Sequence, residues 1–532
     1  MPYFPEIKTI GDITRYHAQQ RGDQCAFVFE NRSQSYAQLD THTNQVANAL
    51  LAEGLKAQTR IAVMDKNSDW FFELVLGSAK VDMVLVGINW RLAPPEVAFV
   101  INNAEAELLF VGPEFLPLAE QIKKELTSVK KIILMTEQSS AQSEDTACYP
   151  DWRNAAASKD PAIKISDKNV AIQMYTSGTT GHPKGVMLSH ANLLASYKVS
   201  GNSVTPEEEW SQWTNKDVSL VAMPNFHIGG TGWAFMGLYA GAKNVILKEF
   251  TPSEVLRCFR EYGISKIFMV PAAMQFVLLD PACKDTDFSS MKYIIYGASP
   301  IPLDLLRRAM ETFQCGFVQL YGMTEGTAIG TYLPAEDHDP AGNKRMKGAG
   351  KARPGVQITI QDAEGKILPL GQVGEICIKS DSIMVGYWKK EQATRETVVD
   401  GWLKSGDAGY MDEDGYVYVH DRIKDMIVSG GENIYPAEIE SALFGHQAIA
   451  DIAVFGVPDD KWGEAVKAVV VVKPGSSVTE AELIAFARQK IAGFKIPKSV
   501  DFMAVLPRNP SGKLLKRELR EPYWKGKDRR VN

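Results

Sequence analysis

The sequence predicts an α/β protein with two domains. The large N-terminal domain is expected to hold mostly parallel sheets with helices plus a β-barrel-like subdomain, and the C-terminal domain is expected to be a small, mobile α+β unit. In the first half, short apolar runs alternate with helical patterns, which is typical of parallel sheets covered on both faces. Strands separated by Gly and Asp turns follow after about residue 340. The charged residues 421–425 then precede a last stretch of mixed helices and strands.

Hydrophobic periodicity predicts the elements of the first half. Residues 36–53 and 70–81 are expected to form helices, because apolar side chains recur there on one helical face. Short apolar runs predict buried strands at 61–64, 84–86, 108–111 and 132–134. Residues 137–151 are rich in Ser, Glu and Gln, which predicts a surface loop.

The later elements divide at a boundary near Arg422. Before it, the antiparallel or barrel-like subdomain is expected to contain strands at 356–360, 374–378 and 415–419. After it, the pattern predicts helices at 436–444 and 479–491 and strands at 452–457, 468–472 and 499–505. The expected organisation is a large domain at 1–421, a hinge at 422–426 and a small domain at 427–532.

Composition excludes several functional classes. The 58 basic and 64 acidic residues give a net charge of −6, whereas a general nucleic-acid binder needs a basic surface. The six cysteines contain no Cys-x-x-Cys pair, so neither a zinc site nor a redox pair is indicated. The N-terminus lacks the basic start and apolar run of a signal peptide. We therefore expect a cytoplasmic protein without a nucleic-acid partner.

One uncharged segment is long enough to span a bilayer. Residues 218–242 contain no Lys, Arg, Asp or Glu. They do contain Pro224, Asn225, His227 and several glycines, a combination that a spanning helix does not tolerate. The segment predicts a strand, a functional loop and a buried helix, without a transmembrane segment.

Residues 175–190 read Tyr-Thr-Ser-Gly-Thr-Thr-Gly-His-Pro-Lys-Gly-Val-Met-Leu-Ser-His. They follow an apolar strand at 170–174 and precede a helix expected from about Ala191. Glycines let the backbone approach a ligand, and successive N–H groups, hydroxyls and a lysine bind phosphate. The segment is not a Walker loop, because Pro183 stands before Lys184. It predicts a different kind of phosphate-binding loop.

The whole string is similar to the signature of the adenylate-forming superfamily, which includes acyl- and aryl-CoA synthetases, luciferases and the adenylation domains of peptide synthetases. Further segments resemble the other motifs of this family in the same order, at 321–325, 402–407, 421–425, 429–436 and 507–513. The resemblance covers nearly the entire chain. Six ordered motifs are far more specific than any one alone.

The resemblance implies an ATP site in which Tyr321 stacks on the purine and Asp407, assisted by Arg422, accepts the ribose hydroxyls. The implied ATP- and AMP-binding residues are Thr176, Ser177, Gly178, Thr179, Thr180, Gly181, Lys184, Gly297, Ala298, Ser299, Gln319, Leu320, Tyr321, Thr324, Asp407, Arg422 and Lys513. On the residues alone, a core position for Tyr321 and a turn position for Asp407 remain open.

The resemblance also implies the catalytic residues. Lys513 is the lysine of adenylation, Glu325 binds Mg²⁺, Thr324 donates to the α-phosphate and His227 lies at the entrance of the acid pocket. Mg²⁺ suits a single carboxylate beside phosphates. Thr324 and Glu325 would equally suit the start of a helix.

Three further sets of residues follow from the resemblance. The implied acid pocket consists of His227, Gly229, Trp233, Tyr296, Gly322 and Met323, although aromatic and Met side chains at such positions also suit a core. The implied CoA channel consists of Ser429, Gly430 and Gly431. Lys424 is the implied pivot of a rotation of the small domain, at a position where some relatives carry Asp.

The expected activity is that of an ATP-dependent acid–CoA ligase. It would form an acyl-adenylate and then an acyl-CoA thioester, with a medium- or long-chain fatty acid as substrate and CoA as co-substrate. An aryl (cinnamate-like) acid ligase and a free-standing amino-acid-activating domain that loads a carrier protein are the alternatives. An inactive nucleotide-binding relative, a luciferase-like oxygenase and a homodimer also stay open.

Overall fold

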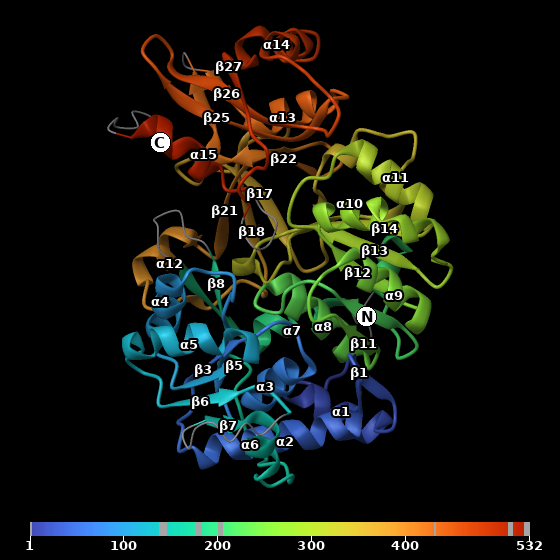
Figure 1. Cartoon of the computed structure of the whole chain (residues 1–532), viewed down its shortest axis with the longest axis vertical. Helices are drawn as coiled ribbons and strands as arrows, with labels where there is room; N and C mark the ends of the chain where they lie inside the picture. Colours follow the sequence, from blue (N-terminus) through green and yellow to red (C-terminus); the bar gives the residue numbers. More distant parts are fainter. Residues whose placement is uncertain are drawn as a thin grey trace.

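The computed structural model describes residues 3–137, 146–176, 183–200, 206–429, 432–508 and 514–525. Figure 1 shows a large lower body and a smaller upper body, the latter formed by the C-terminal residues in orange and red. The described strands form three sheets, of which two belong to the large body.

The first sheet joins a parallel half to an antiparallel half. Its parallel strands, in spatial order, are β1 (Cys25–Phe29), β11 (Lys243–Ile246), β10 (Val218–Val221), β12 (Lys266–Met269), β13 (Tyr293–Gly297) and β14 (Gly316–Tyr321). The antiparallel strands are β2 (Arg32–Ser35) at one edge and, beyond β14, β15 (Thr331–Leu333), β16 (Gly350–Ala352), β22 (Tyr416–Arg422), β21 (Trp402–Met411), β18 (Gly374–Lys379) and β17 (Gln357–Gln361), with β20 (Val398–Val399) beside β21.

The subdomain expected after residue 340 is antiparallel, as predicted. In the described residues β17 pairs only with β18, so the strands form an open sheet. They also continue the edge of the parallel sheet, because β15 pairs with both β14 and β16. Strand spacing in the sequence gives alternation and turns, and it does not reveal which strands close on one another.

The second sheet contains, in spatial order, β19 (Gly386–Tyr387), β9 (Lys184–Ser189), β8 (Val170–Thr176), β4 (Val84–Gly87), β3 (Arg60–Met64), β5 (Leu108–Val111), β6 (Lys131–Leu134) and β7 (Thr146–Cys148). The surface loop predicted for 137–151 is wrong over its last part. Residues 146–148 add β7 to the edge of the sheet, and a helix begins at Tyr149, whose ring is fully buried. The prediction rested on the polar composition of residues 138–145, which lie outside the described residues. That composition gave no indication of the short strand and the helix that follow.

Layers of helices cover both large sheets. The helices of the large body are α1 (Asp12–Arg21), α2 (Tyr36–Ala52), α3 (Asp69–Ala79), α4 (Pro94–Ala104), α5 (Leu116–Ile122), α6 (Tyr149–Asn154), α7 (His190–Ser200), α8 (Ile228–Ala240), α9 (Pro252–Tyr262), α10 (Pro271–Leu279), α11 (Leu303–Phe313) and α12 (Glu391–Thr397). Buried side chains of α1, α2, α3, α7 and α8 share one core with strands of both sheets. Helices α9, α10 and α11 cover the other face of the first sheet, and α4 and α5 that of the second.

Local sequence explains where these helices begin and how deeply they lie. Ser35 and Gln38 form a reciprocal capping box at the start of α2. Every residue of α3 is buried, which is expected for a helix that is apolar on most of its surface and lies between two sheets. The uncharged residues 218–242 form β10, a loop and the buried α8, as predicted.

The small body is built on the third sheet. Its strands are β24 (Glu432–Ile434), β23 (Ile427–Ser429), β26 (Gly463–Val472) and β25 (Ile449–Asp459), with β27 (Ser499–Phe502) beside β26, and its helices are α13 (Pro436–Phe444), α14 (Glu480–Arg488) and α15 (Lys516–Trp524). All of these elements come after residue 426, and they enclose a core of their own. The short 3₁₀ helix Ile423–Asp425 connects the two bodies, and its role as a hinge stays a prediction.

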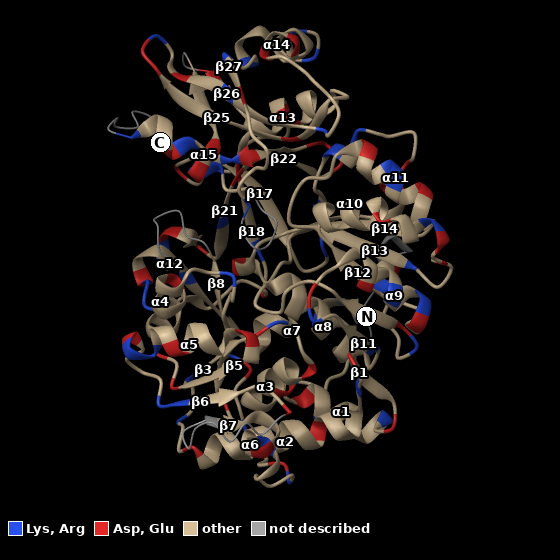
Figure 2. Cartoon of the chain, viewed as in Figure 1, with Lys and Arg blue, Asp and Glu red and all other residues tan. Residues whose placement is uncertain are grey.

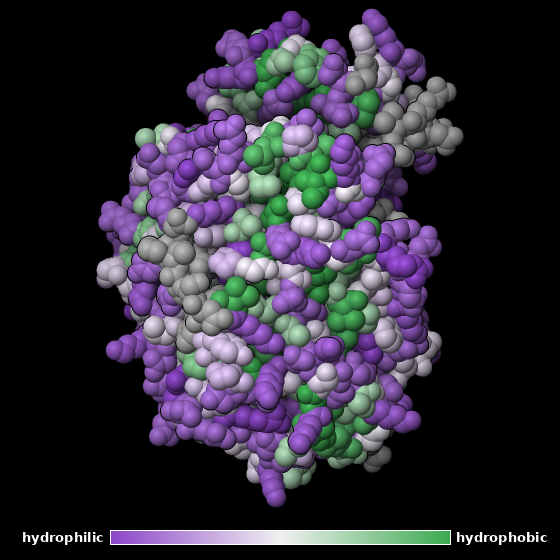
Figure 3. Space-filling model, turned by 180° about the vertical axis from the view of Figure 1, so that it is seen from behind, coloured by the Kyte–Doolittle hydropathy of each residue, from purple (hydrophilic) through white to green (hydrophobic). Residues whose placement is uncertain are grey.

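The surface mixes both signs of charge. In the view of Figure 2, Lys and Arg are interspersed with Asp and Glu, as expected from a net charge of −6. From behind, hydrophobic residues form scattered groups between hydrophilic ones (Figure 3). Throughout the part of the chain that the structure describes, no helix combines the length and the apolar character needed to cross a membrane.

Candidate active site

Sheet topology indicates where a ligand can bind. Strand β10 connects through α8 to β11 on one side, whereas the chain returns to β12 on the other side of β10. Between two such strands a crevice opens outside their carboxyl ends, and it is the usual ligand site of open α/β sheets. The loop that follows β10 carries His227 to this edge. The ends of β13 and β14 lie on the same edge, because these strands are parallel to β12.

Several of the predicted nucleotide-binding residues meet at the ends of β13 and β14. Gly297 lies opposite Leu320, and a Cβ atom at Gly297 would stand only 2.3 Å from the Leu320 carbonyl oxygen. Glycine is therefore required there. The next two residues, Ala298 and Ser299, are exposed, and Ala298 has a left-handed backbone with φ of 67°. Gln319, one residue before Leu320, completes the set of predicted residues at this edge.

Asp407 lies at the centre of a buried polar cluster. The Tyr321 hydroxyl donates to Asp407 Oδ2 over 2.6 Å, and Arg422 Nε pairs with Asp407 Oδ1 over 2.9 Å. Arg422 is fixed a second time by the Ser405 carbonyl oxygen, at 2.9 Å. Burial, and after it the Asp407 carboxylate, raise the pKa of Tyr321 well above its ordinary value, so the hydroxyl remains a donor. The structure thus brings together three predicted nucleotide residues from β14, β21 and β22.

Glu325 forms a second buried acidic centre. It lies in the 3₁₀ helix Thr324–Gly326 directly after β14 and is 6% exposed. Its Oε1 accepts hydrogen bonds from the Tyr387 hydroxyl at 2.9 Å and from Thr176 Oγ1 at 3.4 Å. All hydrogen bonds of this side chain among the described residues go to Oε1, which leaves Oε2 for a cation. A buried carboxylate beside a phosphate-binding hairpin fits Mg²⁺, which takes one or two carboxylates together with phosphate oxygens.

The segment predicted to bind phosphate is a hairpin rather than a loop that leads directly into a helix. Residues 184–189 form β9, antiparallel to β8, and Thr176 pairs with Lys184 at the end where the chain passes from β8 to β9. The prediction missed this strand because the glycines and the single proline of the motif suggested a loop. Of the predicted residues, Ser177, Gly178, Thr179, Thr180, Gly181, Gly430, Gly431 and Lys513 lie outside the described residues.

His227 keeps a buried ring nitrogen. It is the N-cap of α8, and its Nε2 has no hydrogen-bond partner among the described residues. Burial, followed by the charge of Arg91, lowers the pKa of His227 to about 4. The ring is therefore neutral near pH 7. A buried polar atom without a partner inside the fold is available to a ligand, which agrees with the predicted place of His227 at the acid pocket.

The remaining acid-pocket residues lie in two groups, and their contact with the acid stays a prediction. Trp233 is buried in α8, donates from Nε1 to the Leu220 carbonyl oxygen at 3.1 Å and packs edge-on against Trp213. Gly229 faces Phe268. Gly322 and Met323 lie in the turn after β14, together with Thr324.

The predicted CoA-channel residue Ser429 ends β23, and the predicted pivot Lys424 is exposed in the connection between the bodies.

Tyr296 is fully buried in the core beneath α9, α10 and α11. Its hydroxyl lies 2.9 Å from His338 Nε2, and His338 Nδ1 lies 2.9 Å from the Pro334 carbonyl oxygen. A neutral imidazole that donates from Nδ1 and accepts at Nε2 satisfies both bonds. This placement agrees with the core position that the sequence left open for Tyr296.

His338 leads to a prediction about acid stability. Burial lowers the pKa of His338 from 6.5 to about 4. Below pH 6.5 the unfolded chain takes up a proton that the folded chain does not, so stability falls towards pH 4 by up to about 1.4 kcal/mol per pH unit. We expect the urea midpoint to drop less between pH 7.5 and 5.5 in His338→Asn than in the parent. Equal drops in the two proteins would exclude His338 as a source of acid sensitivity.

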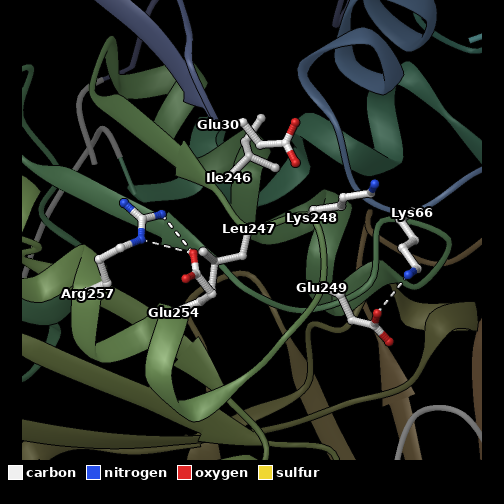
Figure 4. Close-up of a pocket in the computed structure, with 8 residues that line it drawn as sticks. All are labelled: Glu30, Lys66, Ile246, Leu247, Lys248, Glu249, Glu254 and Arg257. Carbon is white, nitrogen blue, oxygen red and sulfur yellow. Dashed lines mark hydrogen bonds and ion pairs between the residues drawn. The ribbon is translucent and has the colours of Figure 1, made fainter. Parts of the chain in front are cut away.

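A charged pocket of about 250 Å³ lies elsewhere on the large body. Figure 4 shows its lining, which is formed by Glu30, Lys66, Ile246, Leu247, Lys248, Glu249, Glu254 and Arg257. Its charges pair with one another, as in Lys66–Glu249 at 3.0 Å and Arg257–Glu254 at 2.8 Å. No predicted site residue lines this pocket, so we do not assign the nucleotide to it.

Comparison with protein families decides the assignment. The family described as AMP-binding enzyme matches residues 14–388, and the AMP-binding enzyme C-terminal domain matches residues 438–513. The chain belongs to the AMP-binding enzyme family. The first match lies within the large body, and the second begins in the small body.

The chain is similar over almost its whole length to relatives whose names state an activity. The chain is 38% identical over 531 residues to the fatty acid–[acyl-carrier-protein] ligase ScoC of Streptomyces coeruleorubidus, which covers 100% of this chain and 99% of the relative. It is 32% identical over 528 residues to the long-chain-fatty-acid–CoA ligase FadD13 of Mycobacterium tuberculosis, covering 97% and 99%. The structure of the anthranilate CoA ligase AuaEII in complex with anthranoyl-AMP is similar, with a TM-score of 0.88, 26% identity and 98% coverage of both chains.

One residue of the site was missed by the sequence analysis. Tyr387 contacts Glu325, yet residues 384–388 belong to none of the six motifs. They are distant in sequence from both the phosphate hairpin and Glu325. The short apolar run with a glycine gives no signal of function, and only the pairing of β19 with β9 reveals its place.

Proposed function

We propose that this AMP-binding enzyme is an ATP-dependent acid–CoA ligase that forms an acyl-adenylate, then an acyl-CoA thioester, and releases pyrophosphate and AMP. The observation that carries the proposal is the pair of buried carboxylates after β14 and in β21. Asp407, bonded to Tyr321 and Arg422, is suited to bind ribose hydroxyls. Glu325, beside the phosphate hairpin, is suited to hold Mg²⁺ against the phosphates.

In the first step a carboxylate oxygen of the acid attacks the α-phosphorus of ATP, and pyrophosphate leaves. Two anions must approach, so cationic groups have to offset the charge. Bound Mg²⁺ would neutralise phosphate oxygens. Lys184, the first residue of β9, and Lys513 supply the protein's own positive charge, and Thr324 supplies a hydroxyl donor at the α-phosphate.

In the second step the thiol of CoA attacks the carbonyl carbon of the acyl-adenylate. The bond between that carbon and the bridging oxygen breaks, and AMP leaves with the oxygen. We propose that the small domain rotates about Lys424 between the two steps. In the proposed pose for the first step, Lys513 faces the phosphates. In the proposed pose for the second step, Ser429, Gly430 and Gly431 border the thiol channel.

For the acid, we propose a medium- or long-chain fatty acid. ScoC and FadD13 are named for fatty acids, which favours this class, whereas AuaEII is named for an aryl acid. An amino-acid substrate is disfavoured, because residues 225–228, Asn-Phe-His-Ile, offer no carboxylate to an ammonium group. His227, neutral and buried, suits contact with an uncharged part of the substrate near its carboxyl group.

A second acceptor is favoured by one specific observation. ScoC, which matches over the whole chain, is named as a ligase for an acyl carrier protein. A carrier protein presents a thiol on the same pantetheine arm as CoA, so the chemistry of the second step is unchanged.

The six cysteines form no disulfide, consistent with a reducing compartment, and we retain the cytoplasmic location as part of the proposal.

A substrate panel tests the proposal. Fatty acids of increasing chain length, cinnamates and amino acids are each incubated with ATP and Mg²⁺, and pyrophosphate release is measured without a thiol, with CoA and with a carrier protein that bears a free pantetheine thiol. We expect release with fatty acids, and faster turnover when CoA is present. Release with none of the acids would contradict the proposed function, whereas stimulation by the carrier alone would change only the acceptor.

A further inference from the structure

The segment 384–388 joins the two parts of the site that handle phosphate and metal. Its β19 pairs with β9, with Gly386 opposite Met187 and Tyr387 opposite Val186. Trp388 N donates to the Gly185 carbonyl oxygen at 2.8 Å, and Met384 N donates to the Glu325 carbonyl oxygen at 2.8 Å. The segment is thus bonded through its backbone to the phosphate hairpin at one end and to Glu325 at the other. We call residues 384–388 the strap.

The Tyr387 hydroxyl fixes the carboxylate of Glu325. It donates to Oε1 over 2.9 Å, a shorter contact than the 3.4 Å from Thr176 Oγ1. A carboxylate oxygen can only accept, so the phenol hydroxyl is the donor of this bond. With Oε1 held in this way, Oε2 has no hydrogen bond to any described residue and is available to a cation.

The ring of the same residue contacts the lysine of the phosphate hairpin. Lys184 Nζ lies 4.8 Å from the centroid of the Tyr387 ring, within the range of a cation–π interaction. One side chain therefore contacts both the carboxylate that would hold Mg²⁺ and the lysine that would meet the phosphates of ATP. It donates a hydrogen bond to the carboxylate, and its ring contacts the ammonium group.

We propose that Tyr387 is a positioning residue that aligns Glu325 for Mg²⁺ and Lys184 for the triphosphate. This inference rests on the proposed function, because it assumes that Glu325 holds the metal. Groups that orient a metal ligand typically change metal affinity by 10- to 100-fold when they are removed. The hydroxyl and the ring act on different partners, so two substitutions can separate them.

The experiment measures binding rather than turnover. Mn²⁺ replaces Mg²⁺, and its dissociation constant in the presence of ATP and absence of acid is measured by electron paramagnetic resonance. Binding of ATP in EDTA is measured separately by calorimetry. We expect Tyr387→Phe to weaken Mn²⁺ binding by about 10- to 100-fold and to leave ATP binding in EDTA unchanged. Tyr387→Leu, which also removes the ring, should weaken ATP binding in EDTA severalfold as well.

Two control variants separate positioning from general destabilisation. Tyr36→Phe removes another buried hydroxyl, which donates 2.7 Å to the Ala242 carbonyl oxygen. Trp388→Phe removes the 2.8 Å bond from the indole to the Asn103 carbonyl oxygen but leaves Tyr387 and its pairing with β9 in place. Both should bind Mn²⁺ as the parent does. If they weaken Mn²⁺ binding as much as Tyr387→Phe, the effect of Tyr387 is structural and the proposal is wrong.

Glu325→Gln distinguishes failure of this inference from failure of the proposed function. If Glu325→Gln weakens Mn²⁺ binding and Tyr387→Phe does not, Tyr387 does not position the ligand, and the metal site stands. If neither variant changes Mn²⁺ binding, the metal is held elsewhere, and both assignments are overturned.

Discussion

Replacing Glu325 with Gln should slow adenylation at least about a hundredfold while the protein stays folded. The amide keeps an oxygen that can accept from Tyr387, so the local hydrogen bond to β19 survives. The charge that balances Mg²⁺ is lost, and the metal no longer neutralises the phosphates as the acid attacks. Pyrophosphate release at increasing Mg²⁺ concentrations measures the effect. A parent-like Mg²⁺ dependence in the variant would remove Glu325 from the metal site.

Replacing Lys513 with Ala should separate the two half-reactions. A charge contact made in the transition state and lost from a shielded site costs about 10²–10³ in rate. If Lys513 faces the phosphates only in the first pose, Lys513→Ala adenylates its acid at least about a hundredfold more slowly. Supplied with a synthetic acyl-adenylate, the same variant should form the thioester at close to the parent rate. Equal slowing of both steps would contradict the two-pose mechanism.

The matched variant for this experiment changes a residue of the predicted CoA channel. Gly431→Leu places a bulky side chain in the predicted thiol channel, so it should spare pyrophosphate release and block CoA consumption. The pair of variants then shows opposite defects. Slow adenylation in Gly431→Leu would mean that the glycine supports the first step as well.

Much of the fold could be predicted because its elements carry strong local signals. Helix α13 begins at Pro436 and ends at Phe444, as predicted, because proline favours the first turn of a helix and an apolar face follows it. The uncharged residues 218–242 separated into strand, loop and helix because their glycines and proline exclude one long helix. Such features depend on neighbours in sequence, which a single chain displays.

Pairing across long distances in sequence could not be predicted. Tyr387 meets Glu325 through β19, which has only two residues and no periodicity to recognise. Strand β9 lies within a motif whose glycines suggested a loop, and its pairing with β8 becomes visible only in the sheet. The nucleotide residues Asp407 and Arg422 were assigned by resemblance, and their contact with Tyr321 depends on how the antiparallel strands continue the parallel sheet.

The account centres on direct attack of a carboxylate oxygen on the α-phosphate of ATP. A fatty acid labelled with ¹⁸O in its carboxyl group is converted to its CoA thioester, and the products are analysed by mass spectrometry. The account predicts that one labelled oxygen appears in AMP and none in pyrophosphate, because the bridging oxygen of the adenylate leaves with AMP. Thioester formation without label in AMP, or with label in inorganic phosphate, would contradict it.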